Sequence, residues 1–594
     1  MTNLSITENV KYWSTHAIFD QHTREEIKSL AEKNDEKELA DRFYRNLEFG
    51  TGGLRGVMAA GTNRMNIYNI RKASTALALY LKTFHGAQKP LKIGISYDSR
   101  INSKEFSMAA AEVFASHGIT ALITKELRPT PLLSFLVRQF KCSAGICVTA
   151  SHNPAAYNGY KVYWETGAQI IPPHDKAIIK IYDSLEKYED IHFTPYSQAL
   201  KDGLIQEIGL ELDDAYIAKV TELSTTHIIP KDFKIVYTPL HGNGLIPVMK
   251  TLKAFGFEDV FPVPEQMHPD GRFPTVKFPN PEDPDALQIA LGHAKRLKAD
   301  LVLATDPDSD RIGIIVREHE SYTFFNGNQL QCLLTDFYLS QLNTAHRMPK
   351  SPLVIKTIVT TDLMNDIASE YGAHCDETLT GFKWICGRIE DYETGAVTPY
   401  RQYVCGGEES YGFLAGSFVR DKDAVSACAI ASQMVATYKA SGRTCTEVLE
   451  QIFRRHGLYQ ESLFTITLPG KDGAEAIQSM MMTMRKAPPR SIDGISCTKL
   501  LDYQFGNQSE FTSSGLKPLG ILTLPKSDVL QFILEDGTKV SVRPSGTEPK
   551  IKFYVSVKDS KAKGASVAEI RNLNELALGR LVRIEQEFVK LAKG

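Results

Sequence analysis

Short apolar runs that alternate with helical stretches are the feature that most restricts the fold of this chain. The runs LKIGISYD, ITALIT and SAGICVTA alternate with segments of helical pattern such as SKEFSMAAAEVFASHG. This order is typical of α/β units, in which strands of one sheet are connected by helices. At 594 residues the chain exceeds what one hydrophobic core usually serves, so the pattern predicts several such domains.

The alternation of strand and helix signals starts anew at several places along the chain, which predicts four domains. The first α/β domain is expected over residues 1–205, the second over 206–322 and the third over 323–457. Residues 458–594 combine the strand signals LFTITL, LQFILEDG and KIKFYVSV with a final charged helix, which predicts a smaller α+β domain. Before the first strand, residues 23–47 carry charges around a sparse apolar stripe, and we expect one exposed amphipathic helix there.

Composition excludes several classes of protein. Hydrophobic residues make up 43% of the chain and charged residues 23%, the proportions of an ordinary folded protein. Lysine and arginine total 68 against 70 acidic residues, so no overall basic surface predicts binding to nucleic acid or to a membrane. The nine cysteines form no Cys-x-x-Cys pair, and no apolar run is long enough for a membrane span or a signal peptide. We therefore expect a cytoplasmic location.

A small polar turn follows the apolar run SAGICV. It reads Thr149-Ala150-Ser151-His152-Asn153-Pro154, so Ser151 is expected at the carboxyl end of a strand, where α/β proteins place reactive groups. A serine hydroxyl needs a base or a metal to become a nucleophile, unless it already carries a phosphoryl group. An Asn-Pro turn with a capping serine explains the hexapeptide equally well.

Three carboxylates at alternate positions follow the apolar run ADLVLAT. They are Asp306, Asp308 and Asp310, and Arg311 comes next to neutralise or orient them. Oxygen ligands at this density suit Mg²⁺, which also bridges to phosphate. A calcium loop is less consistent, because the glycine and the distal glutamate of an EF-hand are missing. A solvated acidic turn is the remaining alternative.

Three further loops carry polar or basic groups. Gly406-Gly407-Glu408-Glu409-Ser410-Tyr411-Gly412 offers carboxylates and a hydroxyl for sugar hydroxyls, although a polar turn is the simpler interpretation. Arg420-Asp421-Lys422-Asp423 precedes a helix that Asp423 can cap, and Lys422 is a candidate for proton transfer. Arg543-Pro544-Ser545-Gly546-Thr547 combines small residues with a bidentate arginine, which indicates either a phosphate cradle or a tight hairpin.

Taken in order, these strings resemble those of the α-D-phosphohexomutase superfamily, which includes phosphoglucomutases and phosphomannomutases. TASHNP resembles the phosphoserine loop, DPDSDR the metal loop, GEESYG the sugar-binding loop and RPSGTEPK the distal phosphate loop. FGTGGLRGVM, YTPLHGNG and TGFKWI are similar to the branch that contains phosphoglucomutases and phosphopentomutase relatives. The resemblance implies three α/β domains of similar topology and a smaller C-terminal domain around a central cleft.

The resemblance also implies roles for individual residues. Ser151 is the expected phosphoryl carrier, and it is expected to hold one Mg²⁺ together with Asp306, Asp308 and Asp310. The expected catalytic groups beside the serine are Arg55, His152, Lys161 and Lys422. The expected substrate-binding residues are Thr380, Gly381, Lys383, Glu408, Ser410, Arg543, Ser545, Gly546 and Thr547.

The implied activity is a mutase that interconverts α-D-glucose 1-phosphate and glucose 6-phosphate, with glucose 1,6-bisphosphate as intermediate and activator. A phosphomannomutase, a phosphopentomutase, a sugar-bisphosphate synthase and a catalytically silent relative are the alternatives. The expected partners are small sugar phosphates, and the sequence does not determine the oligomeric state.

Overall fold

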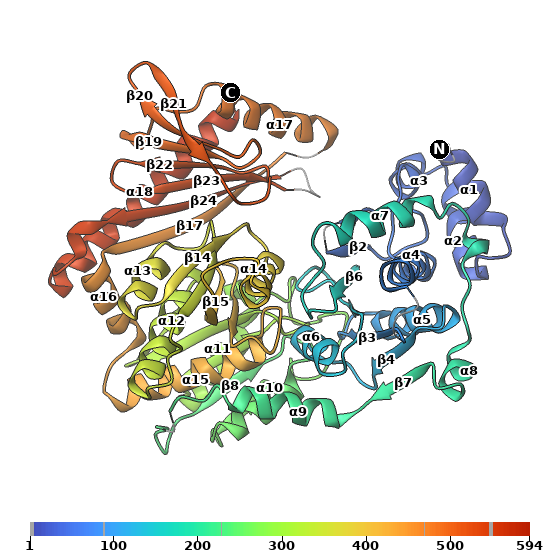
Figure 1. The fold of residues 1–594 in the computed structure, drawn as a ribbon, viewed down its shortest axis with the longest axis horizontal. Coiled ribbons are helices and arrows are strands. Elements are labelled where there is room, and N and C mark those ends of the chain that lie inside the picture. Colours follow the sequence, from blue (N-terminus) through green and yellow to red (C-terminus); the bar gives the residue numbers. More distant parts are fainter. Residues whose placement is uncertain are drawn as a thin grey trace. The chain divides into compact units, whose positions relative to one another are not determined.

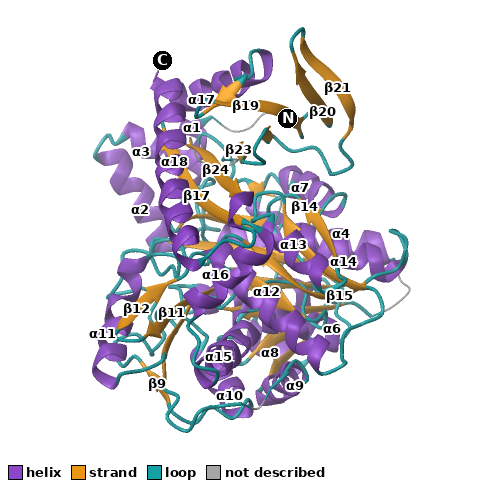
Figure 2. Cartoon of the chain, turned by 90° about the vertical axis from the view of Figure 1, so that its left-hand side faces the viewer, coloured by secondary structure: helices purple, strands orange, loops and turns teal. Residues whose placement is uncertain are grey.

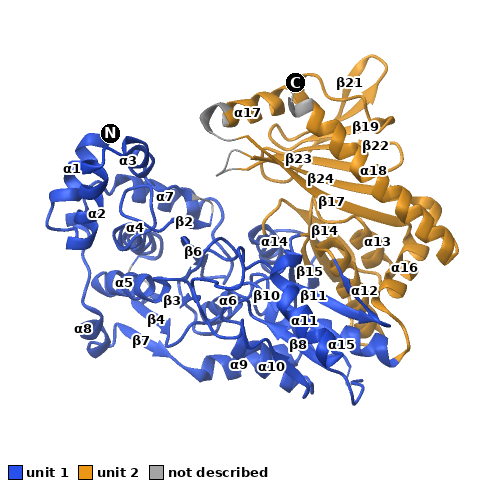
Figure 3. Ribbon diagram, turned by 180° about the vertical axis from the view of Figure 1, so that it is seen from behind, with its two compact units in different colours: residues 1–325, 382–405, 410–440 blue, residues 326–381, 406–409, 441–594 orange. Residues whose placement is uncertain are grey.

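The chain forms four sheets flanked by helices in the part that the structure describes (Figure 1). A computed structural model describes residues 5–50, 52–86, 90–226, 228–468, 470–545 and 550–593. They fall into two compact units: unit 1 holds residues 1–325, 382–405 and 410–440, and unit 2 holds residues 326–381, 406–409 and 441–594 (Figure 3). No helix among the described residues has the length and apolar character needed to cross a membrane.

A seven-stranded mixed sheet of order β1-β2-β6-β5-β3-β4-β7 begins unit 1. Strands β3, β4, β5 and β7 are parallel, and Tyr97 at the end of β3 pairs with Val148 at the end of β5. The carboxyl ends of these two strands therefore lie side by side. The strands are β1 (Phe49–Gly50), β2 (Gly53–Val57), β3 (Lys92–Tyr97), β4 (Thr120–Thr124), β5 (Ala144–Val148), β6 (Tyr157–Trp164) and β7 (Ile205–Ile208).

Helices on this sheet bury its apolar core. Helix α5 contacts β3 and β4, and α6 contacts β3 and β5, so that Ile95 and Ile146 are fully buried. The helices of this region are α4 (Ile67–His85), α5 (Ser103–Ser116), α6 (Thr130–Gln139), α7 (His174–Ser184), η1 (Tyr188–Asp190) and α8 (Tyr196–Lys201). The predicted domain boundary at residue 205 falls on the first residue of β7, which pairs with β4 in this sheet.

Three short helices precede the first strand: α1 (Ile6–Thr15), α2 (Gln21–Glu32) and α3 (Glu36–Phe43). The expectation of one continuous helix over residues 23–47 is therefore wrong. The break comes at Asn34, whose φ of 52° is left-handed, and at Asp35, whose carboxylate accepts a hydrogen bond from the Glu38 backbone N–H and so starts a new helix.

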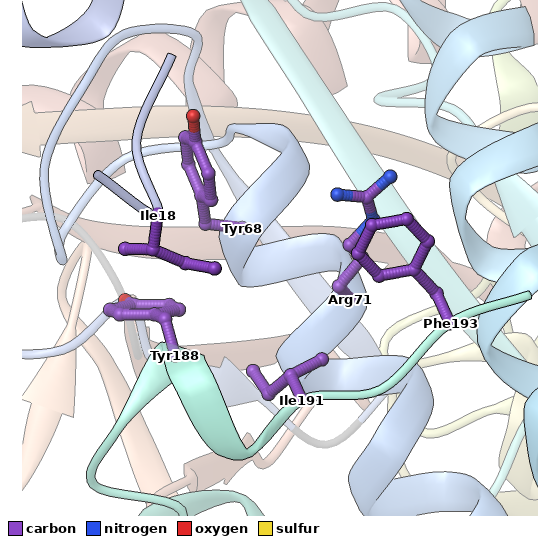
Figure 4. A pocket seen from close by; sticks show the side chains of 6 residues that line it. All are labelled: Ile18, Tyr68, Arg71, Tyr188, Ile191 and Phe193. Atoms are coloured by element: carbon purple, nitrogen blue, oxygen red, sulfur yellow. The ribbon is translucent and has the colours of Figure 1, made fainter. Parts of the chain in front are cut away.

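A small pocket lies between α4, the loop that connects α1 and α2, and the segment that contains η1 (Figure 4). The Arg71 guanidinium lies 3.7 Å from the centre of the Phe193 ring and forms an ion pair with Glu112 at 3.0 Å. None of the lining residues belongs to the predicted site. They are Ile18, Tyr68, Arg71, Tyr188, Ile191 and Phe193.

The second sheet of unit 1 has the order β12-β11-β10-β8-β9 and repeats the topology of the first. In each sheet the first parallel strand, β3 or β8, lies between the next two, and a fourth strand runs antiparallel to the third. The predicted boundary at residue 322 falls inside β12. The elements are α9 (Leu210–Thr221), β8 (Ile235–Thr238), α10 (Leu245–Ala254), β9 (Val260–Pro262), η2 (Pro284–Leu287), α11 (Gln288–Leu297), β10 (Leu301–Thr305), β11 (Ile312–Glu318) and β12 (Ser321–Phe324).

Unit 1 also contains α14 (Phe382–Thr394), β16 (Gly412–Ala415), α15 (Ala424–Ala440) and most of β15 (Gln402–Glu408). Asp423 starts α15 as the sequence predicts, because its Oδ1 accepts hydrogen bonds from the backbone N–H groups of Val425 and Ser426, both at 3.1 Å.

Unit 2 combines a parallel strand pair with a large antiparallel sheet of order β17-β24-β23-β22-β19-β20-β21, with β18 paired to β19. Figure 2 shows α18 lying along β17 and β24, which it contacts. The elements are α12 (Gly327–Thr344), β13 (Pro352–Thr357), α13 (Leu363–Glu370), β14 (His374–Thr378), α16 (Cys445–His456), β17 (Leu458–Thr467), α17 (Gly470–Lys486), β18 (Ser491–Ile492), β19 (Ile495–Asp502), β20 (Asn507–Thr512), β21 (Gly515–Ile521), β22 (Leu530–Leu534), β23 (Lys539–Pro544), β24 (Lys550–Asp559), η3 (Ser560–Ala562) and α18 (Val567–Lys593).

Candidate active site

Ser151 lies just beyond the end of β5 and points toward the second sheet of unit 1. Its hydroxyl donates a hydrogen bond to Asp306 Oδ2 at 2.7 Å, and its Oγ is 3.2 Å from His152 Nδ1. The residue has a φ of 52°, and its backbone N–H bonds to Thr149 Oγ1 at 2.8 Å. A left-handed φ is strained for a non-glycine residue, so the surrounding contacts must hold this turn in place.

Asp306, Asp308 and Asp310 follow β10 and form one buried cluster. Each offers a carboxylate oxygen, and these oxygens lie within 4.8 Å of one another. Among the described residues, Asp308 Oδ1 and Asp310 Oδ1 have no hydrogen-bond partner. Buried carboxylate oxygens of this kind require a cation, and oxygen ligands suit a hard divalent ion. The cluster therefore fits a metal ion.

The electrostatics of the cluster show the same need for positive charge. Burial, together with the charges of Asp308 and Asp310, raises the pKa of Asp306 well above its ordinary value. The pKa of Asp310 is lowered although burial opposes this, because Lys161, Lys422 and Arg311 lie close to it. Protein cations thus compensate the charge of Asp310, whereas the charges of the neighbouring aspartates dominate around Asp306.

Lys161 and Lys422 reach this cluster from different elements. Lys161 on β6 places its Nζ 2.6 Å from Asp308 Oδ2 and 3.1 Å from Asp310 Oδ2. Lys422, just before α15, lies 3.1 Å from the same Asp310 oxygen. Burial opposes the charged form of Lys161, yet Asp308 and Asp310 hold its pKa well above the ordinary value. The structure thus brings together two lysines that are 261 positions apart by the printed numbering.

His152 contacts Ser151, and Arg55 lies close enough for its charge to act on His152. Burial, followed by the charge of Arg311, lowers the pKa of His152 well below its ordinary value, which favours the neutral imidazole. Arg55 on β2 pairs with Gly159 of β6, and its charge also acts on His152. Its side chain is exposed. Arg311 itself forms an ion pair with Glu282 and lies 4.0 Å from Asp310 Oδ1.

Several residues at this site were not expected from the sequence. Thr130, at the start of α6, donates to Asp308 Oδ2 at 2.9 Å, and its N–H donates to the Asp308 carbonyl at 3.0 Å. Asp421 accepts hydrogen bonds from the Tyr163 hydroxyl at 2.6 Å and from Gln169 Nε2 at 2.9 Å. The position of Asp421 between Arg420 and Lys422 was the available signal, whereas nothing in the sequence distinguishes Thr130.

Unit 2 brings together part of the predicted substrate-binding set. Glu408 is buried, its Oε1 accepts a hydrogen bond from the Gly381 backbone N–H at 2.9 Å, and its carbonyl accepts one from Gln331 at 3.1 Å. Thr380 precedes Gly381 and is half-buried. Glu409 accepts a hydrogen bond from the Thr360 hydroxyl at 3.0 Å. The neighbouring Lys383 and Ser410 are half-buried and belong to unit 1.

The predicted phosphate loop is described only in part. Arg543 is half-buried at the end of β23, and the Ser545 N–H bonds to the Lys550 carbonyl at 2.8 Å. Gly546 and Thr547 lie outside the described residues. Tyr554 on β24 was not expected at this site. Burial, followed by the charge of Glu409, raises the pKa of Tyr554, and Arg543 opposes that shift. Tyr554 therefore lies near the loop that contains Glu409 and near the loop that follows Arg543.

A serine beside a buried carboxylate cluster and two lysines is suited to accepting and donating a phosphoryl group, because such transfers depend on positioning and on charge compensation. The repeated α/β topology together with this site defines an enzyme of the phosphosugar mutase class.

The chain belongs to the phosphoglucomutase/phosphomannomutase family, all four of whose domain models match it. The α/β/α domain I model matches residues 46–189, domain II residues 214–319, domain III residues 326–456 and the C-terminal domain residues 508–573. This confirms the superfamily resemblance and the prediction of three α/β domains followed by a smaller C-terminal domain.

Individual relatives agree with the family match. The chain is 34% identical to a phosphoglucomutase of Staphylococcus saprophyticus, with 93% of this chain and 95% of the relative covered. It is 35% identical to a phosphoglucomutase of Staphylococcus aureus, with coverage of 90% and 93%.

Two solved structures share the fold. Parafusin, a phosphoglucomutase from Paramecium, is 17% identical with a TM-score of 0.63, over 90% of this chain and 95% of that one. A phosphoglucomutase/phosphomannomutase family protein from Burkholderia thailandensis is 17% identical with a TM-score of 0.60, over 89% and 96%.

Proposed function

We propose that this chain interconverts α-D-glucose 1-phosphate and glucose 6-phosphate, with phosphorylated Ser151 as the donor and glucose 1,6-bisphosphate as the intermediate. The observation that carries the proposal is the 2.7 Å contact between the Ser151 hydroxyl and Asp306 within a buried cluster of three carboxylates. The names of relatives about one third identical over most of the chain support glucose as the sugar.

The proposed reaction consists of two transfers at one serine. In the first, the bond between phosphorus and Ser151 Oγ breaks, a bond from phosphorus to the free sugar hydroxyl oxygen forms, and the proton of that hydroxyl passes to Ser151 Oγ. In the second, after the bisphosphate has turned over, the bond between its other phosphorus and the sugar oxygen breaks, a bond from that phosphorus to Ser151 Oγ forms, and the serine proton passes to the sugar oxygen. His152, whose Nδ1 lies 3.2 Å from Ser151 Oγ, would orient the serine oxygen, and Lys161, whose Nζ lies 2.6 Å from Asp308, would balance the charges beside it.

Asp306, Asp308 and Asp310 would hold one Mg²⁺, and the two buried oxygens without hydrogen-bond partners support this assignment. When bound, the ion would compensate negative charge on the phosphoryl oxygens. Lys161 and Lys422 then serve to keep the remaining carboxylate oxygens in place.

Glu408 and Ser410 would bind sugar hydroxyls, with Thr380, Gly381 and Lys383 beside them, and the residues around Arg543 would bind the phosphate that is not being transferred. The contact between Glu408 and the Gly381 N–H supports this grouping. Because either end of the sugar must reach Ser151, hydroxyls that are equivalent in both orientations are the natural contacts.

The test compares Ser151→Ala with Ser107→Ala, a buried serine on α5 whose hydroxyl has no hydrogen-bond partner among the described residues. We expect Ser151→Ala to lower kcat for glucose 1-phosphate by at least about 10³-fold, while Ser107→Ala stays close to wild type. Near wild-type turnover by Ser151→Ala would contradict the carrier assignment. Assays with mannose, glucosamine and ribose 1-phosphates determine the preferred sugar by kcat/KM.

A further inference from the structure

Arg100 is a buried arginine in the turn that follows β3. This strand pairs with β5, and Ser151 lies just beyond the end of β5. β3 ends at Tyr97, and the Asp98 N–H bonds to the Val148 carbonyl at the end of β5, which keeps the two strand ends together. The Arg100 side chain, like that of Asp98, has no exposed surface. A charged side chain is buried so completely only where its partners compensate for the loss of water.

The partners of the Arg100 guanidinium are backbone carbonyls of the serine turn. Nη1 donates to the carbonyl oxygens of Pro154 at 2.9 Å and Tyr157 at 3.0 Å. Nη2 donates to the carbonyl oxygens of Ser151 and Asn153. One planar group therefore fixes the directions of four carbonyls between residues 151 and 157.

Asp98 holds this guanidinium from the other side. Its Oδ2 lies 3.3 Å from Arg100 Nε, and its Oδ1 accepts hydrogen bonds from the Arg100 N–H at 2.9 Å and from the Ser103 hydroxyl at 2.7 Å. Ser103 in turn accepts a hydrogen bond from Asn158 at 3.1 Å. The network thus returns to the strand that follows the serine turn.

The turn needs such a constraint. Ser151 is held at a φ of 52°, which a serine avoids in a free chain, and its hydroxyl must meet Asp306 at 2.7 Å. The four carbonyls that bind Arg100 all converge on one cation, an arrangement that would be repulsive without it.

We propose that Arg100, oriented by Asp98, is a positioning residue that sets the backbone of the serine turn and thereby the direction in which Ser151 presents the phosphoryl group. It acts through Ser151 and does not itself contact substrate. This inference rests on the proposed function, because it needs Ser151 to be the carrier.

A lysine cannot donate to four carbonyls in one plane. Arg100→Lys therefore keeps the positive charge but loses the hydrogen bonds that fix the four carbonyls of the serine turn. We expect Arg100→Lys to lower kcat about 10²-fold, as for a displaced reacting group, with KM for glucose 1-phosphate changed by less than about threefold. The matched control is Arg64→Lys. Arg64 is also buried, donates to the carbonyls of Asp41 and Asn63, and forms an ion pair with Asp41 at 2.6 Å, far from this turn in the chain.

The experiment measures thermal midpoint, kcat, KM and the single-turnover rate of transfer from phosphorylated enzyme for both variants. Arg100→Ala with added guanidinium provides a further readout. If Arg100 positions the serine turn, guanidinium should restore kcat without changing the thermal midpoint, whereas a variant that is inactive because it is less stable would not regain kcat in this way. If Arg100→Lys does not fold, Asp98→Asn is expected to lower kcat by about tenfold with KM unchanged.

Three results would overturn the proposal: wild-type kcat in folded Arg100→Lys, wild-type kcat in Asp98→Asn where Arg100→Lys does not fold, or an equal loss of kcat in Arg64→Lys. Wild-type enzyme that fails to turn over any sugar phosphate would instead overturn the proposed function.

Discussion

At the scale of single residues, two lysines of unit 1 differ in how their charge is compensated. Lys161 is half-buried, and the carboxylates of Asp308 and Asp310 stabilise its charged form. Lys72 on α4 lies 4.4 Å from the centre of the Tyr182 ring, and burial lowers its pKa to about 8. The charge of Lys161 is thus balanced by aspartates of the site, whereas the buried charge of Lys72 lowers the stability of the fold.

Replacing Lys161 by methionine removes the cation that contacts two of the three aspartates. We expect Lys161→Met to lower kcat by about 10²-fold or more, because charge around the transferring group is no longer balanced. Lys72→Met is the matched control, with unchanged kcat. Steady-state kinetics with glucose 1-phosphate checks both, and a kcat of Lys161→Met within twofold of wild type would show that the lysine is dispensable.

Lys72→Met is also expected to stabilise the protein at neutral pH. A lysine whose pKa is lowered on folding contributes stability only above its unfolded pKa, near 10.4, and this contribution is lost as pH falls through about 8. Removing the lysine should raise the free energy of unfolding at pH 7 by at most about 3 kcal/mol. Urea unfolding at pH 7 and pH 10.5 measures this gain, which should shrink at the higher pH. An equal gain at both values would refute the explanation.

At the scale of elements, side-chain hydrogen bonds define the start of some helices, among them α3, α12 and α16. Helix α16 begins with a capping box in which the Thr444 hydroxyl accepts from the Glu447 N–H at 3.0 Å and Glu447 Oε2 accepts from the Thr444 N–H at 2.9 Å. Thr444→Ala should destabilise the protein by about 1 kcal/mol. A lower urea midpoint without loss of kcat is the expected result, and an unchanged midpoint would contradict the role of the cap.

The sequence predicts the strand ends better than the contacts made beyond them. Ser151 and Asp306 were expected at the carboxyl ends of strands because an apolar run stops at a polar turn, and β5 and β10 confirm this. Arg100 could not be assigned, because its role depends on β3 lying beside β5, which no local pattern specifies. The pairing of β7 with β4, at the predicted boundary of residue 205, is likewise a long-range contact that no local pattern specifies.

At the scale of the whole molecule, charged groups of β13, of β14 and of the turn before α13 form a network with the C-terminal sheet within unit 2. Lys356 is fully buried and lies 2.8 Å from Asp362 and 2.6 Å from Glu377, and Lys539 on β23 lies 2.7 Å from Asp362. Lys356 and Lys539 lower the pKa of Asp362 although burial opposes this. We propose that the predicted third and fourth domains, divided at residue 457, are held together by this network.

Lys356→Met removes a fully buried cation from two half-buried carboxylates, so we expect it to destabilise the protein by about 1–3 kcal/mol. Thermal unfolding and limited proteolysis of unit 2 measure the effect. Arg571→Met is a suitable control, because the Arg571 side chain is 65% exposed and its ion pair with Glu450 should contribute less than about 1 kcal/mol. Equal midpoints for the two variants would show that the network does not stabilise the molecule.

The central claim is that Ser151 carries the phosphoryl group between the two ends of a sugar. The most direct measurement is mass spectrometry of peptides from enzyme incubated with glucose 1,6-bisphosphate whose phosphoryl groups carry ¹⁸O, then mixed rapidly with unlabelled glucose 1-phosphate. We predict one labelled phosphoryl group on the peptide that contains Ser151, replaced by an unlabelled one after mixing at a rate no slower than kcat. An unmodified Ser151 in active enzyme, or a label that is replaced much more slowly than turnover, would contradict it.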